Sequence, residues 1–347
     1  MIKKRDILAL LLTKGLGPKG VGRIVSVASD QDSHIDLSSM STNKITSHLG
    51  VKPDIADQIP SSIKKADELL NEFESTGIRI LVKGRDGYPE RLARTLKEEA
   101  PLLLFARGNI KLLAEKAVGF CGSRKASEKG LAVAGECSRE LAKRHINVIS
   151  GYAHGVDLAA HRAALEAGGV TTFVLAEGIL HFKLKSDVKD LITEDNHVVV
   201  SEYMPRLPWL ARNAMQRNKT ICGLSNAVVV IESGLKGGTF EAGKAALSLK
   251  RPLFVAEYAQ PAESAEGNAY FLRQGARFLR KKNGAAYLDE LFQAVERDEA
   301  DVPQQYGRKD KALAEKSGDE VEQLSVWELP GVYGSTNKPE QDKDGEK

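Results

Sequence analysis

The stretch that decides the fold runs from residue 118 to residue 157: VGFCGSRKASEKGLAVAGECSRELAKRHINVISGYAHGVD. An apolar segment, residues 117–121, ends in a small-residue turn, and a helical pattern follows from about Ser127 to His145. A second apolar segment, residues 147–150, ends in another glycine loop, with Asp157 placed to cap the next helix. This repeat predicts parallel strands with helix N-termini that point backbone N–H groups outward. Anions bind there, so the phosphate of a nucleotide or nucleic acid is the first ligand to consider.

The same alternation continues through most of the chain. Further segments that we expect to form strands are residues 77–82, 101–106, 171–175, 197–201, 227–231 and 253–256. Helical patterns separate the later ones, including a helix expected between residues 178 and 196. The apolar run at residues 227–231 is typical of a strand that is buried on both faces. The sequence therefore predicts an α/β fold with a parallel sheet doubly wound by helices.

The first 76 residues have a helical pattern. The segment Lys14–Arg23 contains four glycines between apolar stretches and resembles a helix-hairpin-helix unit, whose backbone N–H groups meet DNA phosphates. A plain connection between two helices is the alternative. Ile45–Ile59 is interpreted as a second, degenerate hairpin, and Ser61 or Ser62 is expected to cap a helix that ends at Thr76.

Charge is distributed unevenly along the chain. Residues 298–347 carry 13 acidic and 7 basic side chains, whereas residues 1–297 carry 43 basic and 34 acidic ones. A basic body fits a polyanionic partner, and an acidic, aperiodic tail is typical of disorder. We therefore expect a helical domain at residues 1–76, an α/β domain at 77–297 and a disordered tail at 298–347. One apolar island in the tail, Leu324–Leu329, is interpreted as a docking segment or as plain tail.

Composition disfavours several other classes of protein. No apolar run approaches the roughly 20 residues of a membrane span. The three scattered cysteines, Cys121, Cys137 and Cys222, lack metal-site spacing and cannot all pair. We therefore expect a cytoplasmic protein with no membrane partner, no metal and no cofactor.

A set of short motifs extends over the chain to about Asp289. In order, they are Tyr88-Pro89, Gly122-Ser123-Arg124, Ser150-Gly151-Tyr152-Ala153-His154-Gly155-Val156-Asp157 with Ala160-His161, Glu202-Tyr203, Arg217-Asn218-Lys219 before Gly223-Leu224-Ser225, and Gly275-Ala276. Each motif alone is weak. The ordered set at these spacings resembles the DNA-processing protein A family, also called Smf.

This resemblance implies an extended Rossmann-like parallel sheet domain, preceded by a small helical domain of the helix-hairpin-helix or SAM-like kind. It implies a cytosolic, non-enzymatic protein that binds and protects single-stranded DNA and helps to load a RecA-type recombinase, typically in natural transformation. It also implies a homodimer formed through the Rossmann-like domain. In the family, the arginine of the G-S-R turn and basic residues around an R-N-R-I segment line the DNA groove. The matching residues here are Arg124, Arg217 and Lys219.

The residues that we expect to bind phosphate lie in the glycine turns that follow strands, in the loop at residues 237–239 and on a helix that carries Arg217. They are Gly122, Ser123, Arg124, Gly151, Gly155, Arg217, Asn218, Lys219, Gly237, Gly238 and Thr239. Bases of single strands stack on aromatic rings, and the sequence offers three rings in the loops of this rim. Tyr152, Tyr203 and Trp209 are interpreted as stacking platforms, and the alternative for Tyr203 and Trp209 is that they plug the core beneath the loops. His161 is interpreted as a structural histidine rather than a general base.

One loop supports an alternative from another class. The GGTFEA sequence at residues 237–242 resembles the G-G-x-G-T-x-x-E loop of lysine-decarboxylase-like phosphoribohydrolases, which release a base from a nucleoside monophosphate. Under this interpretation Glu241, paired with Glu232, is catalytic and Arg124 holds the phosphate. A third interpretation is a divergent family member in defence against mobile elements, because the family's R-N-R-I is R-N-K-T at residues 217–220.

Overall fold

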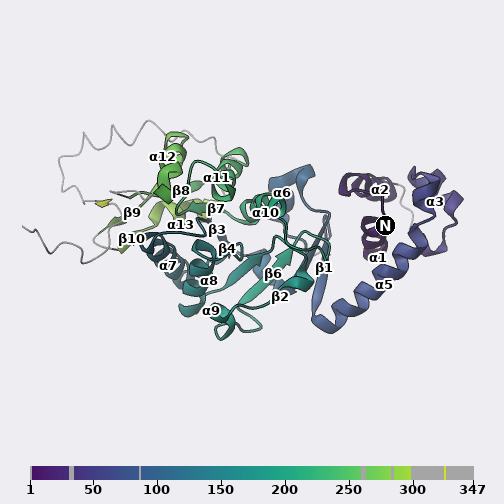
Figure 1. Cartoon of the computed structure of the whole chain (residues 1–347), viewed down its shortest axis with the longest axis horizontal. Helices are drawn as coiled ribbons and strands as arrows, with labels where there is room; N and C mark the ends of the chain where they lie inside the picture. Colours follow the sequence, from purple (N-terminus) through teal and green to yellow (C-terminus); the bar gives the residue numbers. More distant parts are fainter. Residues whose placement is uncertain are drawn as a thin grey trace, which may run out of the picture.

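The computed structural model describes residues 2–30, 35–85, 87–258, 263–282, 285–297 and 324–325 of the chain. Within these residues, a group of N-terminal helices precedes one large, mostly parallel sheet that has helices on both faces (Figure 1). The predicted fold class, an α/β protein with a Rossmann-like sheet and a helical N-terminal part, is confirmed.

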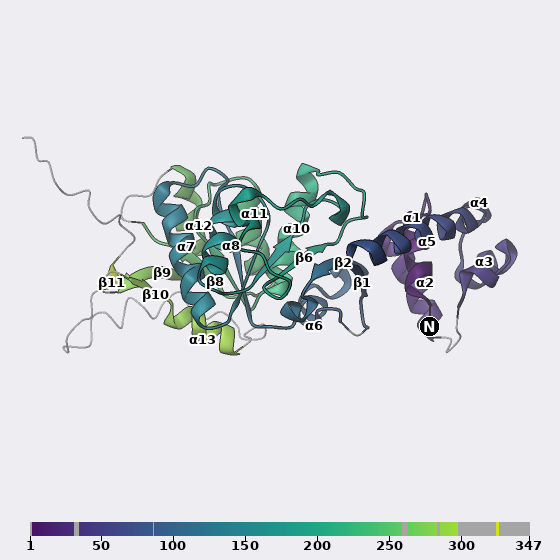
Figure 2. The ribbon, with the colours of Figure 1, turned by 90° about the horizontal axis from the view of Figure 1, so that it is seen from below.

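The N-terminal helices lie at one end of the molecule in both ribbon views (Figures 1 and 2). Their bounds are α1 (Lys4–Leu12), α2 (Pro18–Asp30), η1 (Leu37–Ser39), α3 (Thr42–Leu49), α4 (Pro53–Ala56) and α5 (Ile59–Thr76). Gly15, with a φ of 94°, makes a left-handed turn between α1 and α2. The prediction that Ser61 or Ser62 caps the long helix is wrong. The helix starts earlier, at Ile59, and Ser62 is buried, where it accepts a hydrogen bond from Thr13 (2.9 Å).

The sheet has eleven strands in the described residues, in the order β1-β2-β6-β5-β4-β3-β7-β8-β9-β10, with β11 paired to β9. Their bounds are β1 (Ile78–Val82), β2 (Leu103–Gly108), β3 (Ala117–Cys121), β4 (Asn147–Ser150), β5 (Thr171–Val174), β6 (His197–Ser201), β7 (Ala227–Val230), β8 (Leu253–Ala256), β9 (Arg277–Lys282), β10 (Ala285–Tyr287) and β11 (Leu324–Ser325). All neighbours from β6 to β9 are parallel. At one edge, β2 is antiparallel to β6 and β1 is antiparallel to β2. At the other edge, β10 and β11 are both antiparallel to β9.

Two apolar layers cover the faces of the sheet. The remaining helices are α6 (Glu90–Leu96), η2 (Lys97–Glu99), η3 (Ile110–Leu113), α7 (Glu128–Lys143), α8 (Val156–Glu166), η4 (Ile179–His181), α9 (Ser186–Lys189), α10 (Ala211–Leu224), α11 (Gly238–Ser248), η5 (Glu263–Ala265), α12 (Glu266–Arg273) and α13 (Asp289–Arg297). In β3, Val118 and Phe120 pack with α7, α8 and α13, whereas Ala117 and Cys121 pack with α6, α10, α11 and α12. This alternation is that of a central strand buried on both faces.

One predicted helix is largely missing. Between β5 and β6 the chain forms only η4 and the four-residue α9, instead of a helix that fills the segment from residue 178 to 196. The Gly178 N–H donates to the Leu207 carbonyl at 2.8 Å and the Leu180 N–H donates to the Pro205 carbonyl at 3.1 Å. These bonds tie the start of the segment to the loop after β6.

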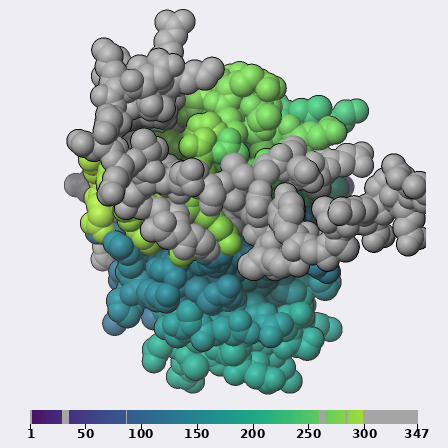
Figure 3. Space-filling view, turned by 90° about the vertical axis from the view of Figure 1, so that its left-hand side faces the viewer, coloured from purple at the N-terminus to yellow at the C-terminus, as the bar shows by residue number. Residues whose placement is uncertain are grey.

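The predicted domain boundaries coincide with element ends but stay predictions. Helix α5 ends at Thr76 and β1 begins at Ile78, while α13 ends at Arg297. Most of the predicted tail lies outside the described residues. Its two described residues form β11, in which Leu324 is opposite Lys282 of β9. Figure 3 shows this end of the molecule, where the green C-terminal elements lie beside the teal middle of the chain.

Candidate nucleic-acid interface

The order in which strands join the sheet reverses between β3 and β7. The chain passes from β3 through β4 and β5 to β6 on one side, and then returns to β7, β8 and β9 on the other. A pocket of about 540 Å³ lies at this reversal, beyond the carboxyl ends of β3 and β7. Ligands of open α/β sheets bind at such points, and the volume is within the range of small-molecule sites, about 300–1,000 Å³.

Seven of the eleven predicted phosphate-binding residues line this pocket together. They are Gly122, Ser123, Arg124, Arg217, Asn218, Gly238 and Thr239. The other four, Gly151, Gly155, Lys219 and Gly237, are not among the lining residues. Segments that are about 100 residues apart in sequence therefore form one site, as predicted for loops at the same edge of a parallel sheet.

Two glycine loops are packed against each other beneath the pocket. A Cβ atom on Gly122 would collide with Val156, and one on Gly155 would collide with the backbone of Ser123. Gly155 also has a φ of 83°, which strains any residue with a side chain. The Val156 N–H donates to the Ser123 carbonyl at 3.3 Å. Gly155 thus acts through packing, because it allows the two loops to approach each other.

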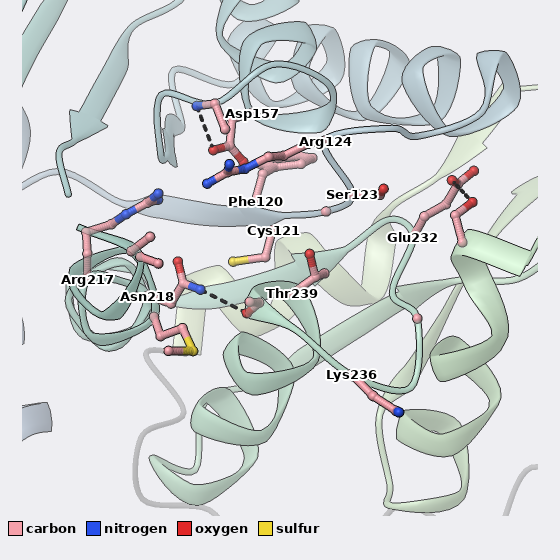
Figure 4. A pocket seen from close by; sticks show the side chains of 18 of the residues that line it. Phe120, Cys121, Ser123, Arg124, Asp157, Arg217, Asn218, Glu232, Lys236 and Thr239 are labelled. Carbon is pink, nitrogen blue, oxygen red and sulfur yellow. Dashed lines mark hydrogen bonds between the residues drawn. The ribbon is translucent and has the colours of Figure 1, made fainter. Parts of the chain in front are cut away.

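Arg124 lies at the exposed side of the pocket. Its guanidinium carbon is 5.5 Å from the centre of the Trp209 ring, and 47% of Trp209 is exposed. This distance allows a cation–π contact. In Figure 4, the guanidinium groups of Arg124 and Arg217 point toward one another across the pocket.

Arg217 is a buried cation near two carboxylates, those of Asp157 and Glu202, but it is not in direct contact with either. Its side chain belongs to α10, and only 7% of the residue is exposed. Among the residues that the structure describes, its guanidinium forms no hydrogen bond and no ion pair. A Cβ atom on Gly151 would collide with the guanidinium nitrogens of Arg217 and with Asp157 Oδ2, so Gly151 makes space for this side chain. A buried guanidinium that lacks direct hydrogen bonds is costly, which favours a ligand that accepts them.

The start of α11 completes the polar wall. Asn218 Nδ2 donates to the Gly238 carbonyl at 2.9 Å and thereby joins α10 to α11. Gly237, with a φ of 93°, is the residue that precedes α11. Lys236 in the same loop lines the pocket, although the sequence argument did not single it out. Its position beside the two glycines could have identified it.

Lys219 lies outside the pocket lining. Its amine forms an ion pair with Glu99 at 2.7 Å. Residues two apart on a helix do not share a face, so Lys219 and Arg217 diverge along α10. A DNA contact through Lys219 remains a prediction.

A second lysine that the sequence argument missed lies behind the Gly151 loop. The Lys185 amine donates to the Tyr152 carbonyl at 2.7 Å and lies 4.5 Å from the Tyr152 ring centre. Burial lowers the pKa of Lys185, and the nearby charge of Arg124 acts in the same direction. No motif marks Lys185, because its approach depends on the irregular chain between β5 and β6.

The two acidic residues of the enzyme alternative do not meet. Glu232 is buried, and its carboxylate accepts hydrogen bonds from the Ser127 N–H at 3.0 Å, the Ser127 hydroxyl and the Ser264 hydroxyl at 2.6 Å. These bonds fix the start of α7 to the end of β7. Glu241 is about half exposed, pairs with Lys244 at 3.1 Å and is not a lining residue. Glu232 lines the pocket with its carboxylate held by two serines, whereas Glu241 lies outside the lining.

Buried partners explain His161 and two of the three candidate rings. His161 is fully buried between the Gly151 carbonyl (2.7 Å) and the Thr171 hydroxyl (2.6 Å), as expected of a structural histidine. The Tyr152 ring packs 5.1 Å from that of Phe173. The Tyr203 hydroxyl donates to the Asn213 carbonyl at 2.7 Å. Tyr152 and Tyr203 are therefore plugs of the core, and only Trp209 presents an exposed ring to the pocket.

The described residues also bear on metal binding and on membrane insertion. No group of three or more His, Cys, Asp or Glu side chains is arranged to hold a metal ion there. In the same part of the chain, no helix combines the length and the apolar character that crossing a membrane requires.

The family model of DNA recombination-mediator protein A matches residues 79–289. The chain belongs to this family. Among curated relatives, it is 32% identical to DNA processing protein DprA of Streptococcus pneumoniae over 196 residues, which cover 56% of this chain and 68% of that protein. It is 30% identical to protein Smf of Escherichia coli over 215 residues, which cover 61% of this chain and 57% of that protein. The match thus spans less than two thirds of the length of the latter.

Solved structures of the DNA recombination-mediator protein A family have the same fold. The X-ray structure of DprA from Streptococcus pneumoniae superposes with a TM-score of 0.66 at 25% identity and covers 80% of this chain and 95% of that one. DNA processing protein A from Helicobacter pylori, a structure described for its single-stranded DNA binding mode, gives a TM-score of 0.51 at 22% identity over 63% of this chain and 94% of that one. The family resemblance read from the motifs is confirmed.

Proposed function

We propose that this protein binds single-stranded DNA at the pocket between β3 and β7. The observation that carries the proposal is the unpaired, buried guanidinium of Arg217, which faces Arg124 across the pocket (Figure 4). Two arginines can hold a phosphate by charge-assisted hydrogen bonds. The backbone turn at Gly122-Ser123 and the start of α11 add further donors on the same side.

Apolar side chains around the pocket support a nucleic acid rather than an inorganic anion. Exposed large apolar residues in the described part of the chain include Trp209, Met215 and Leu235. The first two line the pocket, and Leu235 lies between lining residues Gly234 and Lys236. Bases of a single strand gain free energy by stacking on such surfaces, about 1–3 kcal/mol for each stacked base.

Family membership supports the finer parts of the proposal. We infer that the bound strand is protected and passed to a RecA-type recombinase, and that the protein acts in the cytoplasm as a homodimer without catalysing a reaction. A role in natural transformation and a role in defence against mobile elements both fit such a binder.

A fluorescence anisotropy titration of labelled single-stranded DNA, with duplex DNA as a competitor, tests the proposal. Arg124→Ala and Arg217→Ala should each weaken strand binding by about tenfold or more, the effect of one lost charge-assisted hydrogen bond. Arg162→Ala is the matched control, because Arg162 is exposed on α8 and pairs with Glu166 at 2.7 Å. The proposal would be contradicted if all three variants bound single-stranded DNA as tightly as the wild-type protein, or if the protein preferred duplex DNA.

The enzyme alternative is tested with the same protein. Under the binding function, the wild-type protein releases no free base from nucleoside monophosphates, and Glu241→Gln leaves strand affinity unchanged or slightly tighter because a competing negative charge is gone. Chromatography measures the release of free base. If the wild-type protein releases base and Glu241→Gln abolishes that release, the protein is a phosphoribohydrolase and the proposed function is wrong.

A further inference from the structure

Four buried polar atoms without a protein partner gather behind the pocket. They are Glu202 Oε1, Asn213 Nδ2, Arg217 Nε and Thr220 Oγ1, and none has a hydrogen-bond partner among the described residues. Asn213, Arg217 and Thr220 recur at intervals of four and three along α10, so one face of the helix presents all three. These three residues are 6%, 7% and 1% exposed. A buried polar group normally has a partner, so the concentration of four at one place requires an explanation.

Glu202 and Tyr203 follow β6 and pack against this face of α10. The Tyr203 hydroxyl donates to the Asn213 carbonyl at 2.7 Å, which fixes the end of β6 to the helix. Burial raises the pKa of the Glu202 carboxyl, whereas polar contacts with the Tyr203 and Thr220 hydroxyls, too long or bent to satisfy Oε1, and the charges of Arg217 and Lys219 act in the opposite direction. Glu202 is thus a neighbour of Arg217, yet no ion pair joins the two in the described part of the chain. Tyr88 also faces Glu202, whose charge adds to burial in raising the Tyr88 pKa.

The chemistry of the four atoms defines what can join them. Arg217 Nε and Asn213 Nδ2 are donors, Glu202 Oε1 is an acceptor when ionised, and the Thr220 hydroxyl can be both. An anion would be repelled by Glu202 and a cation by Arg217. Water donates and accepts at once, and a buried water commonly makes about three hydrogen bonds to otherwise unsatisfied groups.

We propose that ordered water occupies the seam between β6 and α10 and bridges Glu202 to Arg217 Nε. Glu202 is then a positioning residue: through the water it holds the guanidinium from behind, while Nη1 and Nη2 lie against the Gly151 loop in the pocket wall. The consequence for DNA rests on the proposed function, whereas the water seam does not.

Two substitutions with side chains about as long as that of Glu202 show whether Glu202 positions Arg217 or acts only through its own negative charge. Glu202→Met removes the acceptor and should weaken single-strand binding by about tenfold, the cost of one misdirected charge-assisted contact. Glu202→Gln keeps an acceptor oxygen and should stay within about threefold of the wild-type protein. A tighter complex with both variants would mean that Glu202 only competes with phosphate, and would overturn the proposal.

A double-mutant cycle shows whether Glu202 acts through Arg217. In an Arg217→Ala background, Glu202→Met should have no further effect on strand affinity. In an Arg124→Ala background, Glu202→Met should still lower strand affinity by about tenfold. A merely structural role would weaken both backgrounds equally and contradict the inference. Melting temperatures show whether each variant folds. If Glu202→Met does not fold, Thr220→Val, which removes one hydroxyl from the same seam, replaces it in the cycle.

A crystal structure of the wild-type protein that shows ordered water tests the seam without any variant. Water within hydrogen-bond distance of both Glu202 Oε1 and Arg217 Nε supports the proposal. A dry seam, or direct contact between the two side chains, overturns it. This result is independent of DNA, so a failure of the proposed function and a failure of the water seam are distinguishable.

Discussion

Arg217 shows how one residue can be identified from sequence while its environment cannot. The R-N-K-T motif marks Arg217 as a candidate for phosphate binding. Its burial, and the neighbouring Glu202, depend on how α10 packs against the end of β6, two elements that are separated by the 202–210 loop. No periodicity in α10 reports that contact, because an inward-facing arginine breaks the apolar pattern on which such an argument relies.

Trp209 carries a prediction at the same scale. As an exposed ring beside Arg124, it should stack on a base, so Trp209→Ala should weaken single-strand binding by about tenfold, within the range of one lost base–aromatic stack. Trp209→Phe keeps a ring and should recover most of the affinity.

Fluorescence reads the same contact directly. The chain has two tryptophans, Trp209 and Trp327, so a Trp327→Phe background leaves Trp209 as the sole indole. Strand binding should then quench its emission. An unchanged emission at saturating DNA would show that no base reaches this ring.

At the scale of elements, α8 is held between β4 and β5 by His161. Its imidazole joins the Gly151 carbonyl to the Thr171 hydroxyl, and burial lowers the pKa of His161 from 6.5 to about 3. The unfolded chain therefore binds a proton that the folded chain refuses between these two pH values. Stability should consequently fall as pH decreases below about 6.5, by as much as about 1.4 kcal/mol per pH unit.

Denaturant titrations at pH 7, 6 and 5 measure this effect. The comparison is with His161→Asn, which lacks the titrating group, so the difference in unfolding free energy between the two proteins should shrink as the pH falls. Parallel pH dependences would show that His161 does not contribute the slope.

The elements differ in how well the sequence predicts them. Strands such as β7 and helices such as α7 were predicted because their patterns are local: an apolar run in one, and an amphipathic stretch behind Ser127 in the other. The chain between β5 and β6 was predicted incorrectly. The start of this segment bonds to the loop after β6, a contact between parts of the chain about 25 residues apart that no local pattern reports.

At the scale of the whole molecule, charge is divided between a basic body and an acidic end. Residues 298–347 carry 13 acidic and 7 basic side chains. Truncation after Arg297 should leave the fold intact, because that cut removes only β11 from the described sheet. Strand affinity should stay equal or rise by a few-fold, since a competing polyanion is removed.

Melting temperatures and anisotropy at several salt concentrations measure both parts of this prediction. The logarithm of affinity should fall linearly with the logarithm of salt, by about 0.7 for each phosphate neutralised. A tail of equal length with neutral amides in place of its carboxylates separates charge from bulk. Loss of folding on truncation would instead show that the tail belongs to the core.

The reversal of strand order between β3 and β7 has a consequence for synthesis on the ribosome. Arg124 leaves the exit tunnel early, but its partners on α10 and α11 follow about 100 residues later. At roughly 5–20 residues per second, the nascent chain spends several seconds with only half of the proposed phosphate site. Under the proposed function, affinity for nucleic acid arises only when most of the sheet has emerged, so an unfinished chain lacks it.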